Sequence, residues 1–184
     1  MQPNLLKVGL SQLLIIDAQT RLISVMPSEP VSACIKNAGI LAQAAALLAV
    51  PIILTEQYPK GLGHTATALA EHLAGVVPVE KTAFSCVAEA KVKRQLSRDH
   101  SQMVLAGMEA HICILQTAMD LMSMGKQVYV AEDAIISRQP ANKANAIARM
   151  REAGCIISNT ESIVFEWLGK AEGDAFKAIS LLVR

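Results

Sequence analysis

The chain has 184 residues and a formal net charge of +1 at pH 7, with 52% hydrophobic and 18% charged residues. This composition excludes a disordered chain, and the length suits one domain with a large core. The near-zero net charge gives no electrostatic reason to expect nucleic acid or an anionic membrane as a partner. We therefore expect a single globular domain over residues 1–184.

Membrane, secretion and metal signals are missing from the sequence. No apolar run reaches the roughly 18 residues of a membrane-spanning helix, and the N-terminus lacks the pattern of a secretory signal. The four cysteines, at positions 34, 86, 113 and 155, form neither a CxxC pair nor a Cys/His cluster, so no zinc site or disulfide scaffold is indicated. We expect a cytoplasmic, reducing compartment, no metal and no other cofactor.

Apolar runs alternate with helical patterns along the chain. Strands are expected at residues 13–16, 52–54, 76–79, 103–106, 128–131 and 156–157. Helices are expected at residues 31–49, 89–98, 112–124, 142–153, 163–168 and 174–183, with a turn-rich loop at 56–75. This alternation predicts an α/β fold, a doubly wound, mostly parallel six-stranded sheet with helices on both faces, as in a Rossmann-like three-layer sandwich.

Polar residues follow several of these strands directly. Asp17 and Lys81 end the first and third strands, and Glu132 or Asp133 follows the fifth. Cys113 lies just past the fourth strand, where a helix is expected to begin. Because ligands bind beyond the carboxyl ends of the strands in such sheets, we expect these residues to meet at one edge.

Cys113 has two interpretations. A thiol at a helix N-terminus lies at the positive end of the helix dipole, which lowers its pKa and favours the nucleophilic thiolate. On this interpretation Cys113 reacts with iodoacetamide faster than the other cysteines. A free cysteine is, however, more often a small buried hydrophobic residue, and this alternative stays open from the sequence.

Asp17 and Lys81 extend the first interpretation to a covalent site. The carboxylate can take the thiol proton, and the ammonium can keep the carboxylate charged and stabilise a thiolate. Each residue also has a simpler role, since a strand-end Asp is common in turns and a lysine is usually solvated. If the site exists, Asp17, Lys81 and Cys113 lie within about 10 Å of one another, roughly one helix diameter.

Four sequence segments resemble those of the isochorismatase-like hydrolases, a cysteine hydrolase superfamily. They are LLIIDAQ, VEKTAFS, VLAGMEAHICILQTA and VAEDAIISR, in the family's order over nearly the whole chain. The resemblance implies that Cys113 is the nucleophile, Asp17 the general base and Lys81 the electrostatic support. It also implies an oxyanion hole made by the Glu109 and Cys113 amides, and a cis peptide bond at Met108–Glu109.

Two departures from the family pattern narrow the expected substrate. The chain has Thr55-Glu56-Gln57-Tyr58 where metal-containing nicotinamidases carry an Asp-x-His pair, which makes nicotinamide a less expected substrate. The namesake enzymes cleave a vinyl ether without a nucleophilic cysteine, so Cys113 argues against that reaction. The segment TEQYPKGLGHT resembles the isochorismatase-domain-containing subgroup. We expect a small molecule with an amide or another C–N bond.

Further residues are candidates for contact with the substrate. They are Gln19, Glu56, Tyr58, His64, Phe84 and His111. His64 is also explained as a surface histidine in a glycine-rich turn, and His111 as a side chain that points to solvent. Cys86 is explained as a core thiol or as a neighbour of the site.

Three functions compete at this point. They are a cysteine hydrolase, a non-catalytic binding or scaffold protein, and a thiol redox sensor that pairs Cys86 with Cys113. The apolar segments at 40–49 and 179–183 favour a homo-oligomer, a dimer or larger. The alternative is that such a helix is fully covered by its own domain.

Overall fold

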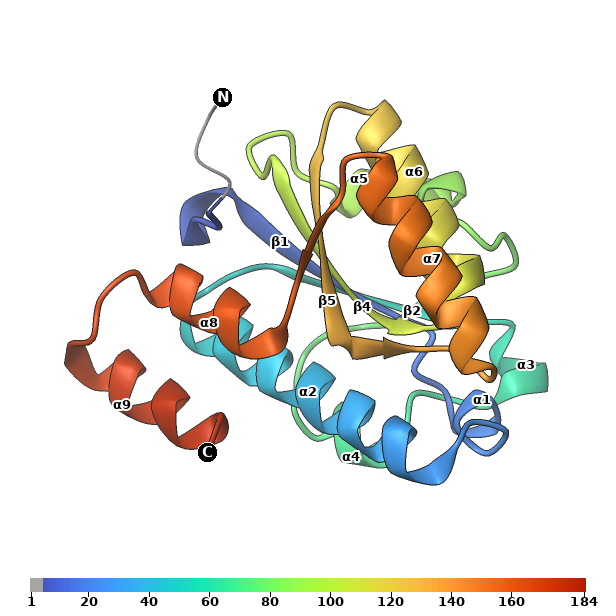
Figure 1. Cartoon of the computed structure of the whole chain (residues 1–184), viewed down its shortest axis with the longest axis horizontal. Coiled ribbons are helices and arrows are strands. Elements are labelled where there is room, and N and C mark those ends of the chain that lie inside the picture. Colours follow the sequence, from blue (N-terminus) through green and yellow to red (C-terminus); the bar gives the residue numbers. More distant parts are fainter. Residues whose placement is uncertain (1–4) are drawn as a thin grey trace.

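The computed structural model describes residues 5–184, and its centre is one six-stranded sheet (Figure 1). The strands follow the order β3-β2-β1-β4-β5-β6, and every paired neighbour is parallel. Their bounds are β1 Ser11–Ile16, β2 Ile52–Gln57, β3 Val79–Lys81, β4 Gln102–Met108, β5 Gln127–Ile136 and β6 Ile156–Ser158. The predicted doubly wound α/β fold is confirmed.

Helices cover both faces of the sheet (Figure 1). Helices α2, α8 and α9 pack on one face, while α5, α6 and α7 pack on the other. The bounds are α1 Thr20–Ile23, α2 Ser28–Leu47, α3 Pro59–Leu62, α4 Thr67–Ala70, α5 Ala90–Gln95, α6 Leu115–Ser123, α7 Pro140–Glu152, α8 Thr160–Leu168 and α9 Gly173–Leu182, with single turns η1 Val8–Leu10, η2 Cys86–Ala88 and η3 Ala110–Ile114.

The continuous apolar run of β1 follows from its position inside this sandwich. Leu13 and Ile15 belong to the core on one face, and Leu14 and Ile16 to the core on the other. All four are fully buried, because a strand inside a parallel sheet is covered on both sides. Successive strands are added on one side of β1 as far as β3 and on its other side from β4 onward, so the switch point of the sheet lies beyond the carboxyl ends of β1 and β4.

Several element boundaries differ from the sequence prediction. The third strand begins at Val79, where it pairs with Thr55, and not at residue 76. The segment 56–75 contains the short helices α3 and α4 as well as turns. Strand β5 continues beyond residue 131 to Ile136, because a register shift against β4 lets its pairing resume opposite Gly107.

Gly107 is required by the close approach of β4 to β1. Its φ is +117°, a conformation that side chains rarely adopt, and an added Cβ would lie 2.0 Å from the carbonyl oxygen of Ile16. The glycine therefore lets β4 pass the end of β1 directly before the turn that carries Cys113.

The apolar segment 40–49 is mostly covered by its own domain. Ile40, Leu41 and Ala45 lie in the core that α2 forms with the sheet, whereas Leu47 is 53% exposed. The apolar pattern that favoured an oligomer is therefore explained mainly by intramolecular packing. Within residues 5–184, no helix is both long and apolar enough to cross a membrane.

Candidate active site

Asp17 follows β1 in a left-handed conformation, with φ of +51° and no exposed surface. Its amide donates to the Thr55 carbonyl at 3.1 Å, and its Oδ1 accepts a hydrogen bond of 2.8 Å from the Thr55 hydroxyl. A non-glycine residue with positive φ is strained and is often found at functional sites. Thr55 on β2 therefore fixes both the backbone and the carboxylate of Asp17.

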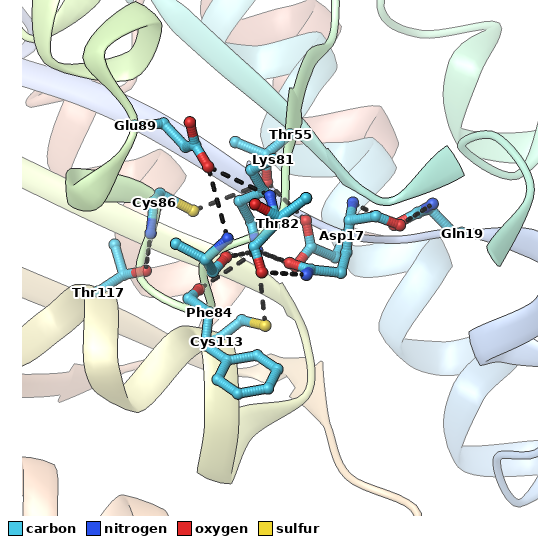
Figure 2. A network of polar contacts seen from close by, with 12 residues as sticks. Asp17, Gln19, Thr55, Lys81, Thr82, Phe84, Cys86, Glu89, Cys113 and Thr117 are labelled. Atoms are coloured by element: carbon cyan, nitrogen blue, oxygen red, sulfur yellow. Dashed lines mark hydrogen bonds and ion pairs between the residues drawn. The ribbon is translucent and has the colours of Figure 1, made fainter. Parts of the chain in front are cut away.

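Lys81 ends β3, and its ammonium is surrounded by acceptors (Figure 2). Nζ lies 2.7 Å from Asp17 Oδ2 and 2.6 Å from the Gln57 side-chain oxygen. It also donates to the carbonyls of Ala83 at 3.1 Å and Phe84 at 3.2 Å. Neither the Lys81 nor the Asp17 side chain is exposed.

The ammonium of Lys81 keeps its proton in this setting. Burial, the largest single effect, would lower the pKa of Lys81. The negative charge of Asp17, the neighbouring Cys86 and Cys113 and the hydrogen bond to Asp17 together outweigh burial, and the net pKa is raised. A lysine with a raised pKa and several fixed acceptors is a permanent positive charge rather than a proton donor. Lys81 can therefore balance the negative charge that develops near it.

Cys113 lies in the π-helical turn η3, which leads directly into α6, and is 6% exposed. Its sulfur is 3.6 Å from Lys81 Nζ, so Asp17 and Cys113 both meet the same ammonium. This close grouping agrees with the expected arrangement of the three residues.

The expected lowering of the Cys113 pKa is wrong. Burial, followed by the charge of Asp17, raises the pKa of Cys113 to about 12, against the opposing effect of Lys81. The thiol lies within a π-helical turn instead of at the first residue of an α-helix, and desolvation exceeds the effect of the dipole. The resting site therefore holds a neutral thiol beside an ion pair.

Asp17 Oδ2 has an open lone pair. It lies 2.7 Å from Lys81 Nζ, yet it has no hydrogen bond of acceptable geometry within the described chain. The distance establishes the ion pair, and no other group of the described chain donates a hydrogen bond to this oxygen. The Asp17 carboxylate and the Cys113 sulfur both adjoin the Lys81 ammonium. The carboxylate can thus take the thiol proton.

The turn after β4 carries the second group of candidate atoms. The peptide bond Met108–Glu109 is cis, as the family resemblance implied. The carbonyl of Glu109 accepts hydrogen bonds from the amides of Ile112 and Ile114, at 3.1 and 3.3 Å. The amide of Glu109 has no acceptor among residues 5–184, so this N–H group is available for a ligand.

Three of the candidate substrate-contact residues are engaged elsewhere. Gln19 donates to the backbone carbonyls of Gln57 and Gly63 and accepts from the Gln57 amide. Glu56 accepts from Thr65 and contacts His64 Nδ1 at 3.0 Å. Since Glu56 alternates with Thr55 along β2, it points to the opposite face of the sheet from Asp17.

The other three candidates are partly exposed side chains. Tyr58 is 57% exposed and Phe84 is 53% exposed. The Phe84 carbonyl accepts a hydrogen bond from Lys81, whose Nζ also contacts the Cys113 sulfur (Figure 2). His111 contacts the Ser137 hydroxyl at 3.0 Å through Nδ1. Of the six residues, Phe84 thus has the most direct relation to the thiol.

The fifth strand does not contribute the acid that was expected at this edge. Glu132 and Asp133 lie within β5 because that strand is longer than predicted. Asp133 Oδ1 accepts from the amide and hydroxyl of Thr160, at 2.8 and 2.9 Å. Its carboxylate holds the start of α8 on the opposite side of the sheet from Cys113.

Thr55 and Gln57 were missed by the sequence analysis. Both hold the charged pair directly, Thr55 at Asp17 and Gln57 at Lys81. Their position in the sequence could have indicated this role. They lie at the end of β2, and the strands on either side of β2 carry charged residues at their ends. Their alternation along the strand could have separated them from Glu56.

The loop after Lys81 is fastened to the helix that follows Cys113. Ser85 Oγ donates to Asp120 at 2.6 Å, and the Cys86 amide donates to the Thr117 hydroxyl at 3.0 Å. Both acceptors are on α6. These bonds fix the position of β3 relative to the thiol.

A cavity of about 610 Å³ lies beside the edge strand β3, and Lys81 and Tyr58 are part of its lining. Its lining also includes Lys60, Lys91 and Arg94 but does not include Cys113. The cavity therefore adjoins the buried cluster at Lys81, and we place the candidate chemistry at the cluster itself. In the described part of the chain, no three His, Cys, Asp or Glu side chains are grouped as metal ligands.

These observations define a doubly wound α/β protein with a buried Asp–Lys–Cys cluster at the switch point of its sheet. A family model described as "Isochorismatase domain" matches residues 11–162. The chain belongs to this isochorismatase family. "Isochorismatase domain-containing protein 2" from Bos taurus is 36% identical over 176 residues, which cover 96% of this chain and 84% of that protein.

Solved structures resemble the whole fold. "Structure of MAR1 Ribonuclease from Caenorhabditis elegans" has a TM-score of 0.90 and 34% identity, covering 97% of this chain and 91% of that one. The YcaC gene product of Escherichia coli, titled an octameric hydrolase of unknown specificity, has a TM-score of 0.90 and 19% identity, covering 99% of this chain and 91% of that one. At this identity the second likeness concerns the fold alone.

Proposed function

We propose that this protein is a cysteine hydrolase that cleaves a small amide or another C–N bond through a covalent intermediate on Cys113. The observation that carries the proposal is the buried ammonium of Lys81, 2.7 Å from Asp17 and 3.6 Å from the Cys113 sulfur. Members of the isochorismatase family are generally hydrolases, which supports the reaction class.

The first half of the proposed reaction forms the intermediate. The Cys113 thiol gives its proton to Asp17 as the sulfur attacks the carbonyl carbon, and negative charge moves from the carboxylate to the carbonyl oxygen. The amides of Glu109 and Cys113 donate to this oxyanion, an effect worth on the order of 3 kcal/mol for each donor. Lys81 keeps its proton and balances the charge throughout.

The second half restores the enzyme. Asp17 passes its proton to the leaving nitrogen as the C–N bond breaks, which leaves a thioester on Cys113. A water molecule then loses a proton to Asp17 while its oxygen attacks the thioester. The C–S bond breaks, the sulfur regains the proton, and a carboxylic acid leaves.

The two rival functions have less support in the geometry. A redox sensor needs an accessible, low-pKa thiolate, but Cys86 has no exposed surface and burial raises its pKa to about 11. A scaffold protein has no need for a desolvated ion pair, because apolar residues in its place are often as stable or more stable.

A panel of small primary amides, ureides and carbamoyl compounds, assayed for ammonia release, tests the proposal. We expect turnover that Cys113→Ala and Cys113→Ser abolish while the protein stays folded. Cys34→Ala is the matched control, since this thiol is also buried but belongs to the core on the other face of the sheet. Near-normal activity of Cys113→Ala would contradict the covalent mechanism.

RNA belongs in the same panel, because one similar structure is titled a ribonuclease. The net charge of +1 gives no electrostatic support for RNA binding. We expect no RNA cleavage above the level of Cys113→Ala. Cleavage of RNA that persists in this variant, without release of ammonia from any amide, would replace the amidase proposal.

We also propose a homo-oligomer in a reducing, cytoplasmic setting. Exposed apolar side chains at Leu47, Val77 and Leu181, which are 53%, 78% and 65% exposed, support contact with a second copy. The YcaC structure is titled octameric. All four cysteines are free. Light scattering that gives a monomer at micromolar concentration would contradict the oligomer.

A further inference from the structure

The segment directly after β5 holds the turn that carries the Glu109 amide. The Glu109 carboxylate is only 5% exposed. It accepts a hydrogen bond of 2.9 Å from the Arg138 amide, and the Arg138 Nε lies 3.1 and 3.2 Å from its two oxygens. One residue, Arg138, therefore binds this buried carboxylate through both its backbone and its side chain.

Strand pairing brings these two residues to the same edge of the sheet. Met108 at the end of β4 is in register with Ile136 at the end of β5, and the next residues along both strands leave the sheet together. The Ser137 hydroxyl lies 3.0 Å from His111 Nδ1. The segment 137–138 thus contacts the turn at two positions on either side of Ala110.

Glu109 is fixed from both of its ends. Arg138 holds the carboxylate, and the amides of Ile112 and Ile114 hold the carbonyl. The remaining polar group, the Glu109 N–H, finds no acceptor in residues 5–184. Hydrogen-bond donors stabilise a transition state when their direction is set beforehand, and the two anchors set the direction of this N–H.

The two charged side chains of the pair differ in their exposure to solvent. The carboxylate is buried, whereas the Arg138 side chain is 54% exposed. A buried carboxylate without a partner is costly, so Glu109 depends on Arg138 more than Arg138 depends on Glu109. Removal of the guanidinium should loosen Glu109 without opening the core, because Arg138 itself lies at the surface.

We propose that Arg138 is a positioning residue, which aims the Glu109 amide at the oxyanion through its pair with the Glu109 carboxylate. This inference rests on the proposed cysteine hydrolase function and adds a residue to it. Arg138 touches no reacting atom. Its effect is confined to the stage of the reaction at which negative charge develops on the substrate oxygen.

The kinetics of Arg138→Gln test this role on an amide substrate from the panel. The backbone N–H bond to Glu109 remains in this variant, and only the side-chain pair is lost. We expect kcat to fall by about tenfold to a hundredfold with KM within about twofold, because a misdirected donor affects the transition state and not substrate binding. Rescue in Arg138→Lys should be incomplete, since an ammonium lacks the planar guanidinium geometry.

Aldehydes give a readout that a merely stabilising role would not change. Acetaldehyde, propionaldehyde and butyraldehyde can each add to the Cys113 sulfur, with the thiol proton passing to Asp17, and place an oxyanion at the Glu109 amide. We expect their inhibition constants to rise in Arg138→Gln by about the same factor as kcat falls. The matching carboxylates, acetate, propionate and butyrate, form no such adduct and should inhibit both proteins equally.

Two further variants complete the design. Lys177→Gln removes a solvent-exposed ion pair with Asp174 on α9 and should leave kcat and aldehyde inhibition unchanged. The double variant Glu109→Gln, Arg138→Gln should be no slower than the slower single variant, because the two side chains act as one unit.

The outcomes separate this inference from the proposed function. A fall in melting temperature without a change in kcat, or equal weakening of aldehyde and carboxylate inhibition, would overturn the positioning role alone. If Cys113→Ala keeps its activity and the wild-type protein forms no aldehyde adduct, the hydrolase proposal fails and the role of Arg138 fails with it.

Discussion

Lys81 and Asp17 form an ion pair of 2.7 Å between two side chains that have no exposed surface. Lys81→Met should therefore lower the free energy of unfolding by about 3 to 5 kcal/mol, because it leaves a buried carboxylate without its cation. Urea denaturation measures this loss. The double variant Asp17→Asn, Lys81→Met should recover much of the stability, and an equally unstable double variant would show that the pair is not the cause.

The same pair predicts how stability changes at high pH. Because the pKa of Lys81 is raised in the folded protein above its ordinary value of 10.5, the folded state holds this proton more tightly than the unfolded state. The resulting stabilisation is complete below pH 10.5 and is lost as the pH rises through the raised pKa. We expect the urea concentration at the midpoint of unfolding to fall between pH 8 and pH 11. Near pH 11 it should fall less steeply in the Asp17→Asn, Lys81→Met variant than in the wild type.

Asp17→Asn should change catalysis and thiol reactivity in opposite directions. Turnover is lost with the base, but the charge that helps to raise the pKa of Cys113 to about 12 is also removed. We therefore expect Cys113 to be alkylated by iodoacetamide faster in the variant than in the wild type at pH 8. Peptide mapping separates this signal from Cys86, and slower alkylation of Cys113 would contradict the assigned electrostatics.

Thr55→Val tests the residue that holds the general base. Valine keeps the shape of threonine but removes the 2.8 Å hydrogen bond to Asp17 Oδ1. A hydrogen bond to a charged group is worth about 1.5 to 3 kcal/mol, so we expect kcat to fall at least about tenfold. Thr67→Val, at the exposed start of α4, is the matched control. An equal loss of activity in this control would contradict a specific role of the Thr55 hydrogen bond.

Gly107→Ala should be the most damaging glycine substitution in the sheet. The added Cβ would meet the Ile16 carbonyl oxygen at 2.0 Å, and the φ of +117° is unfavourable for alanine. Both effects destabilise the fold, by about 3 kcal/mol or more in total. Gly9→Ala meets nothing within 4 Å, and thermal unfolding of the two variants should differ accordingly.

Local sequence patterns correctly predicted several features of the structure. The continuous apolar run 13–16, ended by Asp17, predicted a buried strand with an acid at its end, and both are present. A helix was expected at residues 112–124, and α6 ends at Ser123, shortly before Gly125 with its φ of +80°. These features depend on neighbouring residues, which local patterns record.

The positions of other side chains depend on contacts between distant segments, which the sequence does not show. Asp133 follows an apolar run just as Asp17 does, but β5 continues past it, and its carboxylate holds Thr160 instead. Gln19 and Glu56, two of the expected ligand contacts, form hydrogen bonds with the backbone around residues 57–65. No local pattern tells which face of the sheet receives a side chain beyond a strand end.

The sequence by itself determined the α/β alternation, the candidate trio Asp17, Lys81 and Cys113, and the family. The tertiary structure alone decided their electrostatics. The pKa of Cys113 is raised and not lowered, because desolvation and the charge of Asp17 depend on what surrounds the thiol in space. For the same reason only the folded chain reveals that Thr55 and Gln57 hold the charged pair and that Arg138 holds Glu109.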